Sequence, residues 1–69
     1  MIRLRIKEIC EEKKMSQRKL SKLTGMDIKN IQRIFRNPYS VVTTDTLDRI
    51  AEALNVDARE LIESIPTDD

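Results

Sequence analysis

The sequence predicts an all-α protein, a compact domain of five short helices. Apolar residues recur every three or four positions along the whole chain, which is the spacing of one face of an α-helix, and no stretch alternates apolar and polar residues for long. Capping residues and helix breakers interrupt this pattern at short intervals, so each helix is short. With 69 residues, the chain has room for one hydrophobic core.

The first helix is predicted over residues 2–14. Its apolar stripe consists of Ile2, Ile6, Ile9 and Cys10. Leu4 lies off this stripe, so we expect its side chain to be partly exposed.

The second and third helices are predicted over residues 17–24 and 28–36. Ser16 and Asp27 have the side chains that cap helix N-termini, and Gly25 suits a left-handed turn between the two helices. The apolar residues expected to face the core are Leu20, Leu23, Ile31 and Ile34. The helix predicted over residues 28–36 carries basic and amide side chains. This is how a chain presents a helix to the major groove of DNA.

A loop over residues 37–43 is predicted to precede the last two helices. Asn37 is expected in a left-handed conformation, and Pro38 prevents continuation of the helix. A fourth helix begins after Thr43 or Thr44 and ends at Asn55. Its buried face consists of Leu47, Ile50, Ala51 and Leu54. A fifth helix is predicted to begin with a capping box formed by Asp57 and Glu60 and to end near Ser64. Its inward residues are Leu61 and Ile62.

We therefore predict one domain over residues 1–65, with a helix-turn-helix at 16–37, followed by a flexible acidic tail over 66–69. The chain contains no histidine and one cysteine, Cys10, so no metal site, disulfide or nucleophile–base pair is expected. No apolar run approaches the roughly 18 residues of a membrane span. We expect a cytoplasmic protein that is not an enzyme and has no metal, cofactor or membrane partner.

The net charge of +1 conceals a strong asymmetry. Residues 1–37 contain eleven Lys and Arg against four Asp and Glu, a net of +7, whereas residues 38–69 contain two against eight, a net of −6. A split of this size creates a directional field. Because the positive half contains the basic helix, we interpret the split as favouring nucleic acid as the partner.

The order of these pieces resembles the Cro/phage-repressor (XRE-type) helix-turn-helix family over about Ile2 to Ile62. The resemblance rests on Ser16-Gln17, Leu20, Gly25-Met26-Asp27, Ile31, Arg33, Ile34, Arg36 and the stretch LDRIAEALNVDARELI. It implies a lambda-repressor-like DNA-binding domain. No single piece is specific, but five pieces in order at the right separations make a strong signal.

Two positions depart from the family pattern. Many members pair an Arg on the first helix with a Glu near the end of the third, and here these positions are Cys10 and Phe35. Replacing both partners of a buried ion pair with apolar groups is often neutral or stabilising. We therefore expect Cys10 in the core, packed near Phe35. The second departure is Asn37 in place of the usual Gly.

The third helix supplies the predicted base contacts. With Ile31 and Ile34 facing the core, the residues expected to reach base edges are Ile28, Lys29, Gln32 and Arg33. Lys and Arg match guanine O6 and N7, Gln matches adenine N6 and N7, and an aliphatic side chain packs on the thymine methyl group.

Phosphate contacts are predicted from both sides of this helix. Gln17 resembles the family's phosphate-contacting glutamine, and the N-terminus of its helix adds positive potential. The other predicted phosphate contacts are Arg18, Arg36, Asn37 and Ser40. Tyr39 either joins this clamp or anchors the loop on the fourth helix.

One helix of this kind discriminates too weakly among sequences to find a single site in a genome. Each helix makes about three base contacts, and each contact discriminates against a wrong base by ~1–3 kcal/mol. Specific binding must be favoured over non-specific binding by roughly 4–10 kcal/mol. We therefore predict a homodimeric repressor on a palindromic site in double-stranded DNA. The candidate dimer surface is Val41, Val42, Leu61 and Ile65, although Ile65 could equally be a core residue. The alternative function is an antitoxin-type module that neutralises a protein partner and autoregulates through DNA binding.

Overall fold

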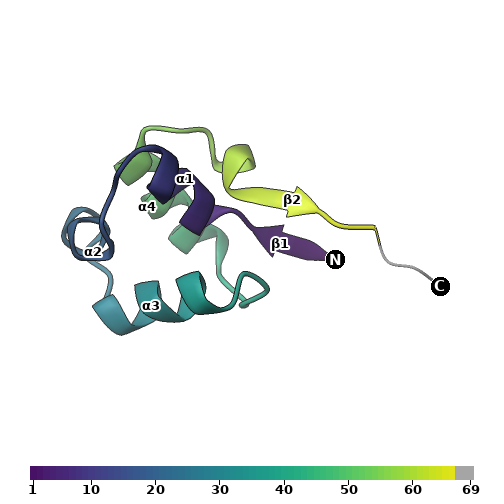
Figure 1. The fold of residues 1–69 in the computed structure, drawn as a ribbon, viewed down its shortest axis with the longest axis horizontal. Helices are drawn as coiled ribbons and strands as arrows, with labels where there is room; N and C mark the ends of the chain where they lie inside the picture. Colours follow the sequence, from purple (N-terminus) through teal and green to yellow (C-terminus); the bar gives the residue numbers. More distant parts are fainter. Residues whose placement is uncertain (67–69) are drawn as a thin grey trace.

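The computed structural model describes residues 1–66. In chain order the elements are β1 (Ile2–Leu4), α1 (Ile6–Glu12), α2 (Gln17–Thr24), α3 (Ile28–Arg36), α4 (Thr44–Leu54), the 3₁₀ helix η1 (Ala58–Leu61) and β2 (Ile62–Ser64). The described residues thus form four α-helices and a two-stranded sheet, so the prediction of five helices in an all-α fold is wrong at both ends of the chain. In Figure 1 the helices form one body, and the two strands project from it together.

The core lies between the helices and draws on every element except β2, whose Ile62 packs against it while partly exposed. Its buried apolar residues are Leu4, Ile6, Ile9, Cys10, Leu20, Ile31, Ile34, Ile50, Ala51, Leu54 and Leu61. α2 contacts both α3 and α4, while α1 contacts α3 and η1 contacts α4. Each fully buried aliphatic side chain stabilises the fold by about 1.5–3 kcal/mol relative to its exposed state. None of the helices within residues 1–66 has the length and apolar character needed to cross a membrane.

The N-terminal segment is a strand where a helix was predicted. Residues 2–4 pair antiparallel with β2, Arg3 opposite Glu63 and Leu4 opposite Ile62. In a strand, residues two apart share a face. Leu4 therefore points into the core and is buried, contrary to expectation, whereas Ile2 lies on the same face beyond the helices and is 54% exposed. The spacing of Ile2, Ile6 and Ile9 mimicked a helical stripe.

The C-terminal segment also departs from the predicted helix. Asp57 and Glu60 form the predicted capping box, but they start only a single 3₁₀ turn, η1. Ile62 then has φ −132° and ψ 154°, and the chain continues as β2. The pairing with β1 supplies hydrogen bonds that a longer helix would forgo, including Arg5 N–H to the Leu61 carbonyl at 2.7 Å. Of the tail predicted over 66–69, only Pro66 lies within the described residues.

Two smaller expectations are also corrected. Leu23 is 55% exposed, because the buried positions of α2 are Leu20 and Thr24, four residues apart. Asn37 ends α3 with φ −128° and ψ 99°, not in a left-handed conformation. Proline restricts the residue before it to extended conformations, so Pro38 decides this geometry.

The helix caps of α4 follow the sequence pattern. Thr43 is the N-cap, and its hydroxyl accepts the Thr46 N–H at 3.1 Å. Asn55 ends the helix in a left-handed conformation, with φ 57°.

Candidate nucleic-acid interface

A hydrogen-bonded turn sets the position of α3 relative to α2. Gly25 has φ +73° and donates its N–H to the Ser21 carbonyl at 2.9 Å. The Ser21 hydroxyl donates to the Met26 carbonyl at 2.5 Å. The buried Thr24 hydroxyl donates to the Leu20 carbonyl at 2.7 Å and accepts the Met26 N–H at 3.2 Å. The turn is therefore fixed by its own side chains, in a conformation that glycine adopts with least strain.

Both helices of this unit begin at the predicted caps. The Ser16 hydroxyl accepts the Lys19 N–H at 3.1 Å, and the Asp27 carboxylate accepts the Lys29 N–H at 2.8 Å. These bonds fix the first residues of α2 and α3, the ends at which positive helix potential is concentrated.

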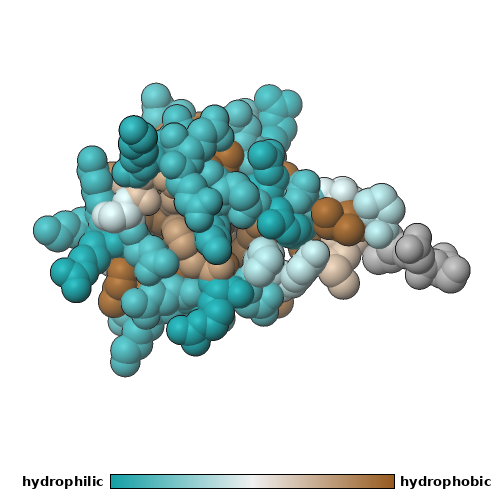
Figure 2. All heavy atoms as spheres, in the orientation of Figure 1, coloured by the Kyte–Doolittle hydropathy of each residue, from teal (hydrophilic) through white to brown (hydrophobic). Residues whose placement is uncertain are grey.

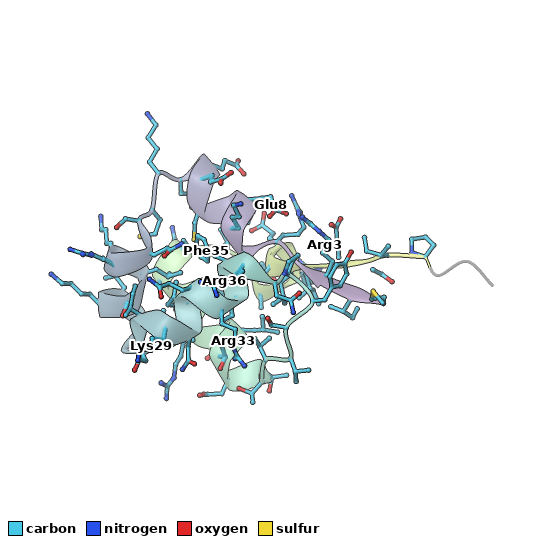
Figure 3. All side chains as sticks on the ribbon, turned by 60° about the horizontal axis from the view of Figure 1, so that its bottom comes forward. Arg3, Glu8, Lys29, Arg33, Phe35 and Arg36 are labelled. Atoms are coloured by element: carbon cyan, nitrogen blue, oxygen red, sulfur yellow. The ribbon has the colours of Figure 1, made fainter. Side chains whose placement is uncertain are left out.

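One face of α3 is buried and the opposite face is exposed. Ile31 and Ile34 lie in the core, as predicted. The exposed side chains of α3 are Lys29, Asn30, Gln32, Arg33 and Arg36. The helix contains no acidic residue. In Figure 3, α3 crosses the front of the molecule, with Lys29, Arg33 and Arg36 placed along it.

Ile28 differs from the other predicted base contacts. It is the first residue of α3 and is only partly exposed, because its side chain packs against the core, as does that of Met26. Its accessible part is therefore smaller than the sequence pattern predicts.

A hollow lies where α1, α2 and α3 meet. It has a volume of about 350 Å³ and is lined by Lys7, Gln17, Gln32, Phe35 and Arg36. Lys7 and Arg36 bring two cations to its rim, and Gln17 is the first residue of α2. These groups offer N–H donors and positive charge on one surface, the chemistry that binds a phosphate.

Sequence reasoning missed Lys7. Nothing local distinguishes it from the other charged residues of α1. Only the packing of α1 against α3 places it beside Arg36.

The residues after α3 form a hydrogen-bonded turn. The Asn37 side-chain oxygen accepts the Tyr39 N–H at 3.1 Å, which leaves its NH₂ group as the donor that would meet a phosphate. The Ser40 hydroxyl donates to the Asn37 carbonyl at 2.7 Å. The Ser40 hydroxyl is thus already engaged as a donor, whereas the side-chain NH₂ group of Asn37 has no acceptor within residues 1–66.

The comparisons with known proteins bear on this geometry. A family model described as the Cro/C1-type HTH DNA-binding domain matches residues 5–67. The chain belongs to this family. A crystal structure of a candidate DNA-binding protein from Bacteroides fragilis superposes with a TM-score of 0.82 at 38% identity, covering 91% of this chain and 100% of that one. No curated protein sequence matches the chain.

In this Cro/C1-type domain, the remaining predicted contact on α2 is exposed. Arg18 follows Gln17 on the first turn of α2. Of the eight exposed acidic side chains among residues 1–66, five lie on α4 and η1 or at their caps, at Asp45, Asp48, Glu52, Asp57 and Glu60. The other three are Glu11 and Glu12 on α1 and Asp27 at the N-cap of α3. Most of the exposed negative charge therefore lies on α4 and η1.

The family's usual ion-pair positions are apolar in this domain. Cys10 is 1% exposed in the core, as predicted, and Phe35 packs against the core from α3, on its α1 side (Figure 3). Burial raises the pKa of the Cys10 thiol to about 11, with a smaller contribution from the Glu11 carboxylate. Cys10 is therefore a neutral core residue. Its direct contact with Phe35 stays a prediction.

The four residues predicted at a dimer surface have different environments. Val41 is 88% exposed, and Val42 and Ile65 are partly exposed. Leu61 is fully buried, so its side chain is not available to a partner, because η1 packs it into the core against α4.

Proposed function

We propose that this Cro/C1-type domain is a sequence-specific, double-stranded DNA-binding transcriptional regulator that acts as a homodimeric repressor on a palindromic operator. The observation that carries the proposal is the exposed face of α3. It holds three cations and two amides, with no acidic side chain, and the two isoleucines behind it fix it to the core. An α-helix of this kind fits the major groove.

The roles follow from position and chemistry. Lys29 and Arg33 lie four residues apart on one face and reach guanine, and Gln32 reaches adenine. Ile28 offers its accessible edge to a thymine methyl group. Phosphates are bound on either side of the groove by Gln17, Arg18, Arg36 and Asn37, with Lys7 added through the hollow it shares with Arg36. Ser40 contributes only if its hydroxyl leaves the Asn37 carbonyl.

The test is the salt dependence of duplex binding. Three cations of each copy, Lys7, Arg18 and Arg36, are assigned to phosphates, so a bound dimer neutralises about six, and log K for DNA should fall with log salt at a slope of roughly −5. Fluorescence anisotropy with a labelled duplex at a series of salt concentrations measures this slope. Binding that does not depend on salt, or no binding to duplex DNA at low salt, would contradict the proposal.

A further inference from the structure

The helix-turn-helix unit contains one acidic residue in a basic stretch. Between Lys13 and Thr44 the sequence has eight Lys and Arg residues, one Asp, which is Asp27, and no Glu. The visible face of the helical body is mostly hydrophilic (Figure 2), so the sign of the charge distinguishes its surfaces better than polarity does. The exposed side chain of Asp27 lies at the N-cap of α3. In the proposed function this end of α3 enters the major groove, so a negative charge approaches the DNA phosphates.

Helix capping alone does not explain the charge of Asp27. Ser16 caps α2 and Thr43 caps α4, each through a neutral hydroxyl group. Asn, Asp and Ser are about equally effective as N-caps. A carboxylate does interact favourably with a helix N-terminus, but at a helix end that faces DNA it is also repelled by the phosphates. Capping therefore accounts for a polar side chain at this position and not for a charged one.

The Asp27 carboxylate is fixed in place and has one oxygen free. Its Oδ1 accepts the Lys29 N–H at 2.8 Å, and its backbone carbonyl accepts the Asn30 N–H at 3.0 Å. Within residues 1–66 the side chain forms no ion pair and accepts no other hydrogen bond. A carboxylate has acceptor capacity for several hydrogen bonds, so Oδ2 can accept one from a ligand.

The base edges of the major groove offer this carboxylate one well-matched partner. Guanine presents the acceptors O6 and N7, and thymine presents the acceptor O4, so both repel a carboxylate. Adenine presents its N6 donor beside the N7 acceptor, whereas cytosine presents the N4 amino group alone. Lys29 and Arg33 have donors only and cannot accept from cytosine. Asp27 supplies the charged acceptor that they lack.

We propose that Asp27 is a specificity-determining residue, which accepts a hydrogen bond from the N4 amino group of a cytosine in each half-site. The inference rests on the proposed function, because it requires α3 to lie in the major groove. At any other sequence the same carboxylate faces acceptors and phosphates without a donor. Asp27 therefore raises specificity both by binding the right base and by weakening the complexes with wrong ones.

The first test is the selection of bound sites from random duplex DNA by the wild-type chain and two variants. Asp27→Asn removes the charge and keeps an effective N-cap. Asp57→Asn is the matched control, because the Asp57 carboxylate caps η1 in the same way and accepts the Arg59 N–H at 2.9 Å. Wild type and Asp57→Asn should enrich the same cytosine in each half-site. Asp27→Asn should replace it with adenine, because an amide side chain matches adenine N6 and N7.

The second test measures affinity by fluorescence anisotropy, with the selected duplex and with a duplex of unrelated sequence. Asp27→Asn should bind the unrelated duplex more tightly than wild type does, and the ratio of the two affinities should fall about tenfold. N4-methylcytosine at the selected position lacks the amino hydrogen that faces the major groove. It should weaken wild-type binding about tenfold and leave the affinity of Asp27→Asn nearly unchanged. Urea denaturation confirms that each variant is folded.

The outcomes separate this inference from the proposed function. An identical selected site from wild type and Asp27→Asn, or an equal change in affinity for both duplexes, would overturn this inference alone and leave Asp27 as a helix cap. Enrichment of no sequence by the wild-type chain would contradict the proposed function itself, and this inference with it.

Discussion

The guanidinium Nη1 of Arg3 lies 2.7 Å from Glu8 Oε2 and 2.7 Å from Glu63 Oε1. One side chain thus joins β1 to α1 and to β2, two elements that are far apart in the sequence. These hydrogen bonds raise the pKa of Arg3, and the bond to Glu8 has the larger effect. The network therefore ties both strands to the helical body.

Arg3→Ala is expected to lower the melting temperature by a few degrees, because two partly exposed carboxylates lose their shared partner. Arg49→Ala is the matched control. Arg49 forms a single ion pair within α4, to Asp45 at 3.2 Å, and both side chains are more exposed than those of the Arg3 network. Its loss should therefore change the melting temperature less. Thermal denaturation at low and high salt measures both, and high salt should reduce the difference. Equal shifts for the two variants would show that the network does not stabilise the sheet.

Gly25→Ala is expected to destabilise the domain by about 1 kcal/mol, through backbone strain alone. Gly25 has φ +73°, and no atom lies within 4 Å of an added Cβ, so steric crowding adds nothing. Gly25→Asn should cost less, because Asn tolerates the left-handed conformation better than Ala. Urea denaturation measures both free energies of unfolding. A much larger loss for both variants would mean that the turn has no room for a side chain.

The stability of the domain should fall between about pH 9 and pH 11 because of Cys10. The pKa of this thiol is about 11 in the fold against an ordinary value of 9.0. As pH rises through 9, the unfolded chain loses the proton first and is favoured, and the effect levels off above the folded pKa. Comparison of wild type with Cys10→Ala across this range isolates the contribution. The variant should be less stable overall but should lack this component of the slope. Parallel slopes would contradict the assignment.

Arg33→Ala is expected to relax sequence preference at one base pair of each half-site, with a loss of about 1–3 kcal/mol in discrimination. Lys29→Ala should act similarly at a neighbouring position. Arg59→Ala is a control of the same residue type, because Arg59 is highly exposed on η1 and pairs with Asp57. Competition binding with single-base variants of a bound site measures the change. A uniform loss across all sequences would instead assign Arg33 to a phosphate.

Lys7→Ala is expected to weaken binding to all duplexes alike and to reduce the salt slope by about 0.9 for each bound copy, the value for one phosphate contact. Gln17→Ala should also weaken all sequences alike, because Gln17 lines the same hollow. Lys13→Ala, at the C-cap of α1, is the control. If Lys7→Ala and Lys13→Ala change the slope equally, the hollow has no special part in DNA binding.

The helix-turn-helix unit could be predicted from the sequence because its signals are local. Ser16, Gly25 and Asp27 act within a few residues of their own positions, and all three adopt the predicted capping or turn geometry. The same holds for Thr43 and for the capping box at Asp57.

The two ends of the chain could not be predicted in this way, because their structure depends on each other. Ile2 matched a helical stripe, and only pairing with Ser64 across the domain makes it a strand residue. The burial of Leu4 and the exposure of Leu23 follow from packing that periodicity does not encode. Lys7 was missed for the same reason, since its place beside Arg36 exists only in the folded domain.

The most direct test of the central claim, that α3 reads DNA sequence, is selection of bound sites from random duplex DNA by the wild-type chain and by Arg33→Ala. We predict an enriched site with two-fold symmetry, half-sites about one helical turn apart, and a guanine position whose enrichment is lost in Arg33→Ala. Enrichment of no sequence by the wild-type chain, or an identical site from both proteins, would contradict the account.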